Sequence, residues 1–303
     1  MMRALRVLRV SMFGMMMPLA LTGCAAFNYV AADAPQPLME LSALSPKPRI
    51  AVVLGSGGPR GYAHVGMIKA LEGAGIAPDL IVGSSVGSLI GAFWASGLSA
   101  AEIELKANSG GPLTLFDVSP FADRGWIRGQ RLQDYVNGEL REATLQTLPR
   151  PMIVVATRRD TKQPALFMAG NIGVAVRASS AIPKVISPVG INGVEYEDGD
   201  ESLPLAVKAA RDAGADFVIA VDVTARDGSA PVGTAPVWLA RDAKRRARIV
   251  PEVALADFVI HPDMGYAASP FRSFFVKAQT AGEVETKARL PELLALLRQR
   301  GLR

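Results

Sequence analysis

The segment from Asp79 to Ala95 constrains the fold of this chain more than any other part of the sequence. In it, an apolar run leads into residues 83–87 (GSSVG), and a second apolar run of helical length follows. A G-x-S-x-G turn needs little bulk two residues on either side of its serine, because a strand and a helix approach each other there while the hydroxyl points outward. The pattern therefore predicts a strand, a sharp turn and a helix, with Ser85 exposed at the apex.

Ser85 has two possible roles in such a turn. A serine at the apex of this motif is usually a nucleophile. A glycine-rich turn between a strand and a helix can also hold a serine that only caps the helix, since serine is a favoured N-cap residue. The motif alone does not decide between these roles, so the rest of the chain has to.

A strand, a loop and a helix also precede this segment. Residues 49–54 (RIAVVL) are typical of a short buried strand, and a glycine-rich loop at 55–61 (GSGGPRG) leads from it into a predicted helix at 63–72. The loop does not match a phosphate-binding motif, because its last interval is too long for G-x-G-x-x-G. We interpret it as an oxyanion hole, in which the amides of Gly57 and Gly58 face the oxyanion formed when a serine attacks an ester carbonyl.

The order of the predicted elements indicates the fold class. Alternating strands and helices predict an α/β fold with a mostly parallel sheet covered by helices. At 303 residues, half of them hydrophobic, the chain suits one large domain or at most two. Further strands are predicted at 152–157, 165–167, 216–223 and 258–260, and further helices at 130–140, 172–180, 203–213, after Pro236 and around Leu290, Leu293, Leu294 and Leu297.

Three other segments bear on a site. Residues 193–199 (GVEYEDG) predict an edge strand that delivers Glu197 and Asp198 into a turn. The irregular stretch 108–129 holds several aromatic side chains, which either form a lid or acyl pocket or seal the core beneath a long loop. Four of the five side chains at 244–248 are basic, and we expect a solvated helix face there rather than contact with anionic head groups.

The N-terminus is typical of an export signal. Three arginines precede an apolar stretch at residues 10–21, which is too short for a comfortable membrane span of about 20 residues. The next residues, LTGC at 21–24, resemble the lipobox of bacterial lipoproteins, in which the signal is cut before the cysteine and the cysteine is lipidated. We therefore predict a signal peptide at 1–23 and lipidation of Cys24, whose alternative role as a buried structural thiol would not explain the small residues before it.

The domain organisation follows from this start. Residues 24–48 are rich in alanine, proline and polar side chains without periodicity, which predicts a tether before a hydrolase domain at 49–303. Lipidation would anchor the protein to a membrane. Ala25, rather than aspartate, follows the cysteine, and by resemblance to lipoprotein sorting this favours the outer membrane, facing the periplasm, of a Gram-negative cell.

Composition excludes several other classes of function. The chain has 33 basic and 28 acidic residues, and removal of the three N-terminal arginines leaves a net charge of about +2, too little to indicate a nucleic-acid partner. One cysteine and two well-separated histidines make a zinc site improbable, and no D-x-[DN]-x-[DN]-G loop is present. We expect no cofactor and no metal, while a calcium site built only of carboxylates stays open. The sequence does not indicate the oligomeric state.

Four blocks in the same order resemble the patatin-like phospholipase family, over roughly residues 49–223. They are residues 54–71 (LGSGGPRGYAHVGMIKAL), 82–97 (VGSSVGSLIGAFWASG) and 177–183 (RASSAIP), and Asp198-Gly199, which matches a D-G-[GA] block. The resemblance implies a three-layer α/β/α sandwich and an acyl hydrolase acting on membrane phospholipid, lysophospholipid or another acyl ester.

The resemblance also implies roles for individual residues. Ser85 would be the nucleophile and Asp198 its base, a pair that needs no histidine, with Gly57 and Gly58 as the oxyanion hole. Arg60 would orient the glycine-rich loop or meet the substrate phosphate, with the orienting role preferred. The chain departs from the family pattern at Asp200, where the family has glycine or alanine. Its carboxylate would either raise the pKa of Asp198 or point to solvent.

Two alternatives stay open. A Ser-His-Asp esterase of the α/β-hydrolase kind would use Ser85, then Asp198 or Asp222, then His261, which have the required chain order. The other histidine, His64, stands where the patatin-like family often has histidine, in a packing role. The second alternative is a lipoprotein with an inactive hydrolase domain that binds lipid or a partner protein.

Overall fold

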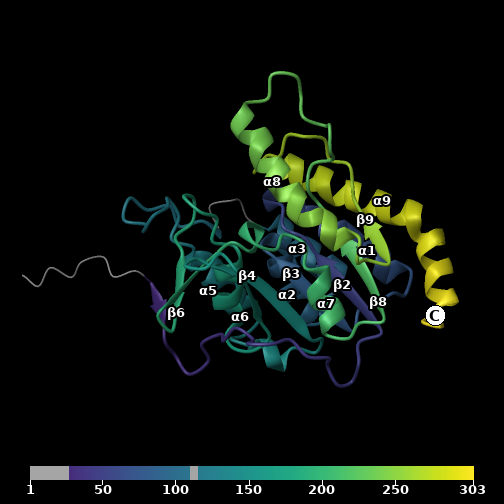
Figure 1. Ribbon diagram of the computed structural model, residues 1–303, viewed down its shortest axis with the longest axis horizontal. Helices are drawn as coiled ribbons and strands as arrows, with labels where there is room; N and C mark the ends of the chain where they lie inside the picture. The colour runs from purple at the N-terminus through teal and green to yellow at the C-terminus, as the bar shows by residue number, and fades with distance from the viewer. Residues whose placement is uncertain (1–26, 110–114) are drawn as a thin grey trace, which may run out of the picture.

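The structure is a computed structural model that describes residues 27–109 and 115–303 (Figure 1). Within these residues the strands form one nine-stranded sheet, covered by helices on both faces. The strand order is β1-β6-β7-β4-β3-β2-β8-β9, and β5 pairs with β4 outside this path. The strands are β1 (Asn28–Tyr29), β2 (Ile50–Leu54), β3 (Leu80–Ser84), β4 (Met152–Arg158), β5 (Pro164–Phe167), β6 (Val189–Ile191), β7 (Val194–Glu197), β8 (Phe217–Val221) and β9 (Phe258–Ile260).

Helices and short 3₁₀ turns connect these strands. The α-helices of the described residues are α1 (Ala63–Gly73), α2 (Val86–Ala95), α3 (Ala100–Asn108), α5 (Gln130–Glu139), α6 (Ile172–Ser179), α7 (Val207–Asp212), α8 (Pro236–Val253) and α9 (Arg272–Gln299). Their 3₁₀ turns are η1 (Gly58–Tyr62), η2 (Leu145–Thr147) and η3 (Gly199–Glu201).

The centre of the sheet is parallel. Strand β2 pairs in parallel with β3 and β8, and the parallel pairing continues from β3 to β4 and from β8 to β9. Only β5 and β7 run antiparallel to β4, and β7 also runs antiparallel to β6. The predicted three-layer α/β/α fold with a mostly parallel sheet is therefore confirmed.

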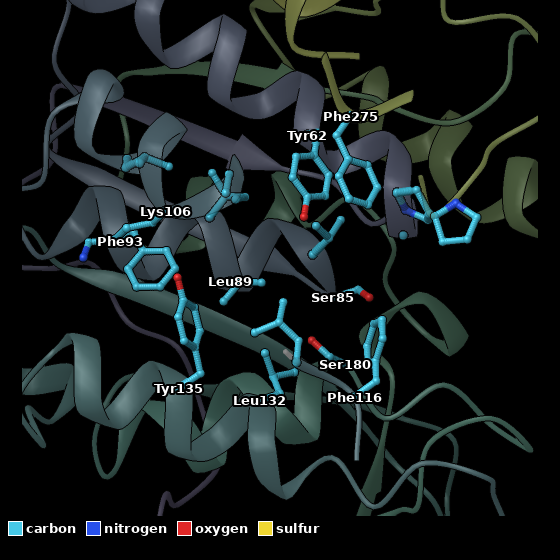
Figure 2. Close-up of a pocket in the computed structure, with 18 of the residues that line it drawn as sticks. Tyr62, Ser85, Leu89, Phe93, Lys106, Phe116, Leu132, Tyr135, Ser180 and Phe275 are labelled. Atoms are coloured by element: carbon cyan, nitrogen blue, oxygen red, sulfur yellow. The ribbon is translucent and has the colours of Figure 1, made fainter. Parts of the chain in front are cut away.

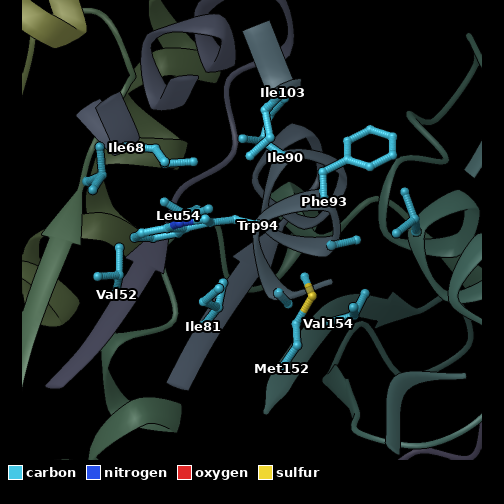
Figure 3. Packing of buried hydrophobic residues seen from close by; sticks show 14 of the residues in the cluster. Val52, Leu54, Ile68, Ile81, Ile90, Phe93, Trp94, Ile103, Met152 and Val154 are labelled. Carbon is cyan, nitrogen blue, oxygen red and sulfur yellow. The ribbon is translucent and has the colours of Figure 1, made fainter. Parts of the chain in front are cut away.

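Both faces of the central strands are buried, which explains their continuous apolar sequences. Alternate residues of β2 enter two separate cores. Val52 and Leu54 pack with Trp94 of α2 in the larger core (Figure 3), while Ala51 and Val53 pack on the opposite face with side chains of α7 and α8. The indole N–H of Trp94 donates a hydrogen bond of 3.0 Å to Glu72, which joins α2 to α1.

Two predicted elements need correction, and one helix was not predicted. Strand β7 is not an edge strand, because β6 and β4 pair with it on its two sides. The helix predicted from residue 203 begins at Val207, after the segment with Pro204. Helix α3 was missed, although Ser99 and Glu102 form a capping box at its start, a pattern visible in the sequence. Strand β9 and the apolar face of α9 were predicted correctly.

The described part of the predicted tether is packed against the domain instead of extending freely. Strand β1 pairs with β6, the amide of Leu38 donates to the carbonyl of Leu166, and the amide of Leu44 donates to the carbonyl of Ala213. The predicted signal peptide and Cys24 lie outside the described residues. Among the helices of residues 27–109 and 115–303, none is both long and apolar enough to cross a membrane.

Candidate active site

Ser85 stands in a strained turn between β3 and α2. Its backbone has φ 54° and ψ −125°, a conformation that residues with a side chain rarely adopt. A Cβ atom added to Gly83 would lie 2.5 Å from the carbonyl oxygen of Gly87, and one added to Gly87 would lie 2.1 Å from that of Leu54. Both motif glycines are therefore required by backbone contacts, as the sequence predicted. Ser85 itself is only 5% exposed, because it faces a cavity and not the outer surface.

The side chain of Ser85 contacts Asp198. Its Oγ donates a hydrogen bond of 2.8 Å to Asp198 Oδ2, across 113 residues of sequence. Ser179, at the end of α6, supports this pair: its Oγ accepts a hydrogen bond of 2.8 Å from the Ser85 amide and donates one of 2.5 Å to the carbonyl of Val155. The block at 177–183 thus joins the serine turn to β4, a role that the sequence did not reveal.

Asp198 follows β7 and is fixed on all sides. Its amide donates to the carbonyl of Ala181 at 3.0 Å, and its own carbonyl accepts from Thr157 Oγ1 at 2.8 Å. Its Oδ1 accepts a hydrogen bond of 2.8 Å from the amide of Asp200. The side chain is 2% exposed, and burial, followed by the charge of Asp200, raises the pKa of Asp198 above its usual range. Proton affinity at this carboxylate is therefore increased.

The glycine-rich loop brings backbone amides to the same place. Gly58 lines the cavity together with Ser85 and has φ 55°. Among the hydrogen bonds of the described residues, none uses the amide of Gly57 or of Gly58. Ser56, by contrast, donates its amide to the carbonyl of Pro204 at 2.8 Å, which fixes the start of the loop. The unpartnered amide of Gly58, in the same cavity as Ser85, is suited to an oxyanion hole, and Gly57 is the residue before it.

Arg60 is bound to a loop far along the chain. Its guanidinium donates to the carbonyl of Gly265 at 2.9 Å and to that of Tyr266, both between β9 and α9. The side chain is buried, and burial together with the charge of Arg245 lowers its pKa. These contacts fit the loop-orienting role of Arg60, because they occupy the guanidinium with protein carbonyls.

Neither histidine contacts the Ser85–Asp198 pair. His64 is fully buried, its Nε2 lies 2.9 Å from the carbonyl oxygen of Gly55, and burial lowers its pKa to about 4. His261 Nε2 lies 3.0 Å from the carbonyl oxygen of Thr224, and its Nδ1 is 3.7 Å from Asp222 Oδ2. The carboxylate of Asp222 also accepts a hydrogen bond of 2.7 Å from Arg246. The histidine and acid of the alternative triad are thus near each other, but they are bound to other groups.

An apolar cavity of about 190 Å³ opens beside Ser85 (Figure 2). Ser85 immediately precedes α2, and Leu89 and Phe93 follow on the helix at intervals of about one turn, so this wall follows the helix for about 12 Å. Opposite lie side chains of α5, and the stacked rings of Tyr62 and Phe275, 3.9 Å apart, form another wall. The lining includes Val86, Ile90, Ile103, Leu115, Phe116, Leu132, Tyr135, Ile182 and Ile186.

The irregular stretch at 108–129 contributes to this cavity. Leu115 and Phe116 line it, whereas Phe121 and Trp126 are 70% and 72% exposed. The pocket interpretation therefore holds for the first two side chains, while the two exposed aromatic residues do not seal the core. Leu113, which the sequence places in the same stretch, lies outside the described residues.

Of the four basic residues predicted to form a solvated face on α8, Lys244 is exposed, whereas the three arginines are paired. Arg245 binds Asp200, Arg246 binds Asp222, and Arg248 Nη1 donates to the carbonyl of Asp200 at 3.0 Å. The carboxylate of Asp200 accordingly points toward α8 and not to solvent. No group of three or more histidine, cysteine, aspartate or glutamate side chains in the described part of the chain is arranged to hold a metal ion.

A model of the patatin-like phospholipase family matches residues 52–204, about half of the chain. The chain belongs to the patatin-like phospholipase family. The matched range contains the glycine-rich loop, the serine turn and Asp198, so the resemblance stated from the four sequence blocks is confirmed.

The chain is similar to several curated proteins, and each match spans only part of the relative's length. An NTE family protein of Mycobacterium tuberculosis is 35% identical over 190 residues, which are 59% of this chain and 50% of that protein. Human patatin-like phospholipase domain-containing protein 6 is 31% identical over 185 residues, covering 59% of this chain and 14% of the relative. Lysophospholipase nte1 of Aspergillus fumigatus is 30% identical over 187 residues, covering 60% of this chain and 12% of the relative. The chain spans half or less of the length of these curated relatives.

A solved structure shares the fold. The crystal structure of VipD from Legionella pneumophila superposes with a TM-score of 0.55 at 15% sequence identity, covering 85% of this chain and 70% of that one. At this identity the likeness concerns the fold alone.

Proposed function

We propose that this protein is a serine hydrolase that cleaves acyl esters of phospholipids or lysophospholipids through an acyl-enzyme. The observation that carries the proposal is the hydrogen bond of 2.8 Å from Ser85 Oγ to Asp198 Oδ2 beside an apolar cavity. Family membership supports a lipid substrate, and one relative is named a lysophospholipase.

The reaction would proceed in two halves. Asp198 accepts the proton of Ser85 as Oγ attacks the ester carbonyl, and the amides of Gly57 and Gly58 stabilise the resulting oxyanion. Asp198 then returns the proton to the departing alcohol, which leaves an acyl group on Ser85. In the second half a water molecule gives its proton to Asp198 and attacks the acyl carbonyl, and Ser85 recovers the proton as the fatty acid departs.

The surroundings of Asp198 suit it to act as the base. An ordinary aspartate, with a pKa of about 3.9, is a weak base for a serine hydroxyl. Burial of Asp198 raises its pKa, so the carboxylate binds the transferred proton more strongly. The hydrogen bond from Ser85 already joins the two atoms between which the proton would move.

The cavity offers a place for the acyl chain. Its wall runs from Ser85 past Leu89 to Phe93, so a chain bound there would begin at the nucleophile and continue along α2. Aliphatic and aromatic side chains make up most of the lining, and burying apolar surface contributes about 25 cal/mol per Å². We propose that this contact selects acyl groups over polar substituents.

We further propose that the protein is an outer-membrane lipoprotein facing the periplasm. Support comes from the sequence: an arginine-bearing apolar segment at 1–23, then Cys24 in the lipobox-like LTGC. Acyl chains on Cys24 would hold the hydrolase domain (49–303) near its membrane substrate.

The test is lipid analysis of membrane phospholipid incubated with the wild-type protein and with Ser85→Ala. Ser229→Ala is a matched control, because Ser229 is only partly buried and its hydroxyl donates within its own turn, to the carbonyl of Arg226. We expect fatty acid release and covalent labelling by a serine-reactive fluorophosphonate for the wild type and the control, and neither for Ser85→Ala. A folded wild-type protein that neither takes the label nor releases fatty acid would refute the proposal.

A further inference from the structure

The carboxylate of Asp200 joins three separate parts of the chain. Its two oxygens accept hydrogen bonds of 2.8 and 2.9 Å from Arg245 Nε, and Oδ2 accepts one of 2.5 Å from Arg245 Nη2. Oδ1 also accepts a hydrogen bond from the hydroxyl of Ser56, the residue before Gly57. One side chain therefore connects the glycine-rich loop, the turn at Asp198 and helix α8.

The same residue also contacts Asp198 directly. The amide of Asp200 donates to Asp198 Oδ1 at 2.8 Å, while Ser85 occupies the other oxygen. The carboxylate of Asp200 and the guanidinium of Arg245 both lie close enough to act electrostatically on Asp198, and in opposite directions. Their side chains are 18% and 21% exposed, so solvent and salt screen these charges only partly.

The charged groups facing Asp198 are few. From the 3₁₀ turn η3 comes Asp200, and from α8 come Arg245 and, at the carbonyl of Asp200, Arg248. The serine turn and β4 contribute only the uncharged hydroxyls of Ser85 and Thr157, the latter bound to the carbonyl of Asp198. Asp200 and Arg245 therefore dominate the electrostatic environment that adds to the effect of burial.

We infer that Asp200 and Arg245 are a pair of positioning residues for Ser85 and Asp198: their ion pair fixes the Asp198 turn against the glycine-rich loop and balances the charge beside the base. The inference rests on the proposed function, which it deepens. Asp200 alone would oppose ionisation of Asp198, and Arg245 alone would favour it. Arg245 offsets part of the effect of Asp200, whose charge is the larger of the two at Asp198.

The backbone at position 200 does not need the aspartate side chain. The patatin-like pattern at this position is glycine or alanine, and the hydrogen bond to Asp198 Oδ1 comes from the amide, which alanine retains. Asp200→Ala thus removes a charge and leaves the backbone hydrogen bond in place. Arg245→Met removes the opposite charge and keeps much of the side-chain volume.

The two substitutions should move the pH profile in opposite directions. The measurement is the rate of fluorophosphonate labelling of Ser85, and of hydrolysis of a soluble acyl ester, between mildly acidic and mildly alkaline pH. In Asp200→Ala the acid limb should move to lower pH by about one unit, because Arg245 then acts on Asp198 unopposed. In Arg245→Met it should move to higher pH by a smaller amount, because Arg245 has the weaker effect on Asp198, and the double variant should fall between them.

Two further variants complete the experiment. Lys244→Met removes an exposed cation from the same helix and should leave the limb unmoved. Asp200→Asn removes the charge but keeps a polar side chain, and it should shift the limb in the same direction as Asp200→Ala. It therefore provides the same test if Asp200→Ala folds poorly. Variants that lose rate without shifting the acid limb, or shift it in the same direction, would overturn the inference. A folded wild-type protein that is neither labelled nor active would instead refute the proposed function, and the inference with it.

Discussion

Replacing Asp198 with asparagine isolates the cost of burying its carboxylate. Asparagine has nearly the same shape, and its amide can donate to Ser85 while its oxygen accepts from the amide of Asp200. In the wild type, burial and the charge of Asp200 raise the pKa of Asp198. A carboxyl group whose pKa is higher in the folded protein contributes its full stability below the unfolded pKa of about 3.9, and loses it as pH rises through the folded pKa.

The size of this effect follows from proton binding. Between the two pKa values the folded protein holds about one more proton at Asp198 than the unfolded chain does. The free energy of unfolding of the wild type should therefore fall by up to about 1.4 kcal/mol per pH unit in this window, relative to a protein without the group. Asp198→Asn lacks that slope, so its Tm should rise relative to the Tm of the wild type as pH increases. Because about 1 kcal/mol corresponds to roughly 2 to 4 °C in a large domain, the Tm difference should widen by about 3 to 5 °C per pH unit.

The assay is thermal and urea unfolding of both proteins across a pH series from about 4 upward. The matched control is Asp212→Asn, which removes an exposed carboxylate on α7 and should show no such widening. Asp198→Asn should also lose about 10²- to 10⁴-fold in kcat/KM, the range for loss of a general base. A Tm difference that stays constant with pH would refute the argument that burial of this carboxylate is the source of its raised pKa.

Two further outcomes are expected. Gly87→Ala should destabilise the protein by about 2 to 3 kcal/mol and abolish most labelling, because the new Cβ would lie 2.1 Å from the carbonyl oxygen of Leu54. The control Gly138→Ala, in open space on α5, should stabilise the protein by about 0.5 to 1 kcal/mol. Similar urea midpoints for the two variants would contradict the steric argument. His261→Ala should keep ester hydrolysis within about tenfold of wild type, whereas a loss of several orders of magnitude in folded protein would indicate a histidine base.

The buried strands, the serine turn and the family could be predicted from the sequence because they depend on local properties. The glycines on either side of Ser85 are needed wherever a strand and a helix meet so closely. The mostly apolar run at 216–223 is typical of a buried strand, and it forms β8. The pairing of Ser85 with Asp198 was also expected, although from the family resemblance and not from any local rule.

Partners that come from distant parts of the chain could not be predicted in this way. Strand β7 was assigned to an edge because its alternation does not reveal that β6 and β4 pair with both of its sides. The hydrogen bond from Ser179 to Val155 of β4 could not be predicted, because a short serine-containing block has the same sequence pattern whether or not a strand packs against it.

The basic residues of α8 show most clearly which contacts a sequence cannot predict. On the sequence alone Arg245 belongs to a run of charges, and such runs usually face solvent. Whether a charge is solvated or paired depends on which groups the fold brings within hydrogen-bond distance and how much water remains, and here Asp200, 45 residues away, comes within that distance. The sequence by itself determined the strained serine turn and the class of fold. Only the tertiary structure decided which charges surround Asp198, because that depends on packing between segments far apart in the chain.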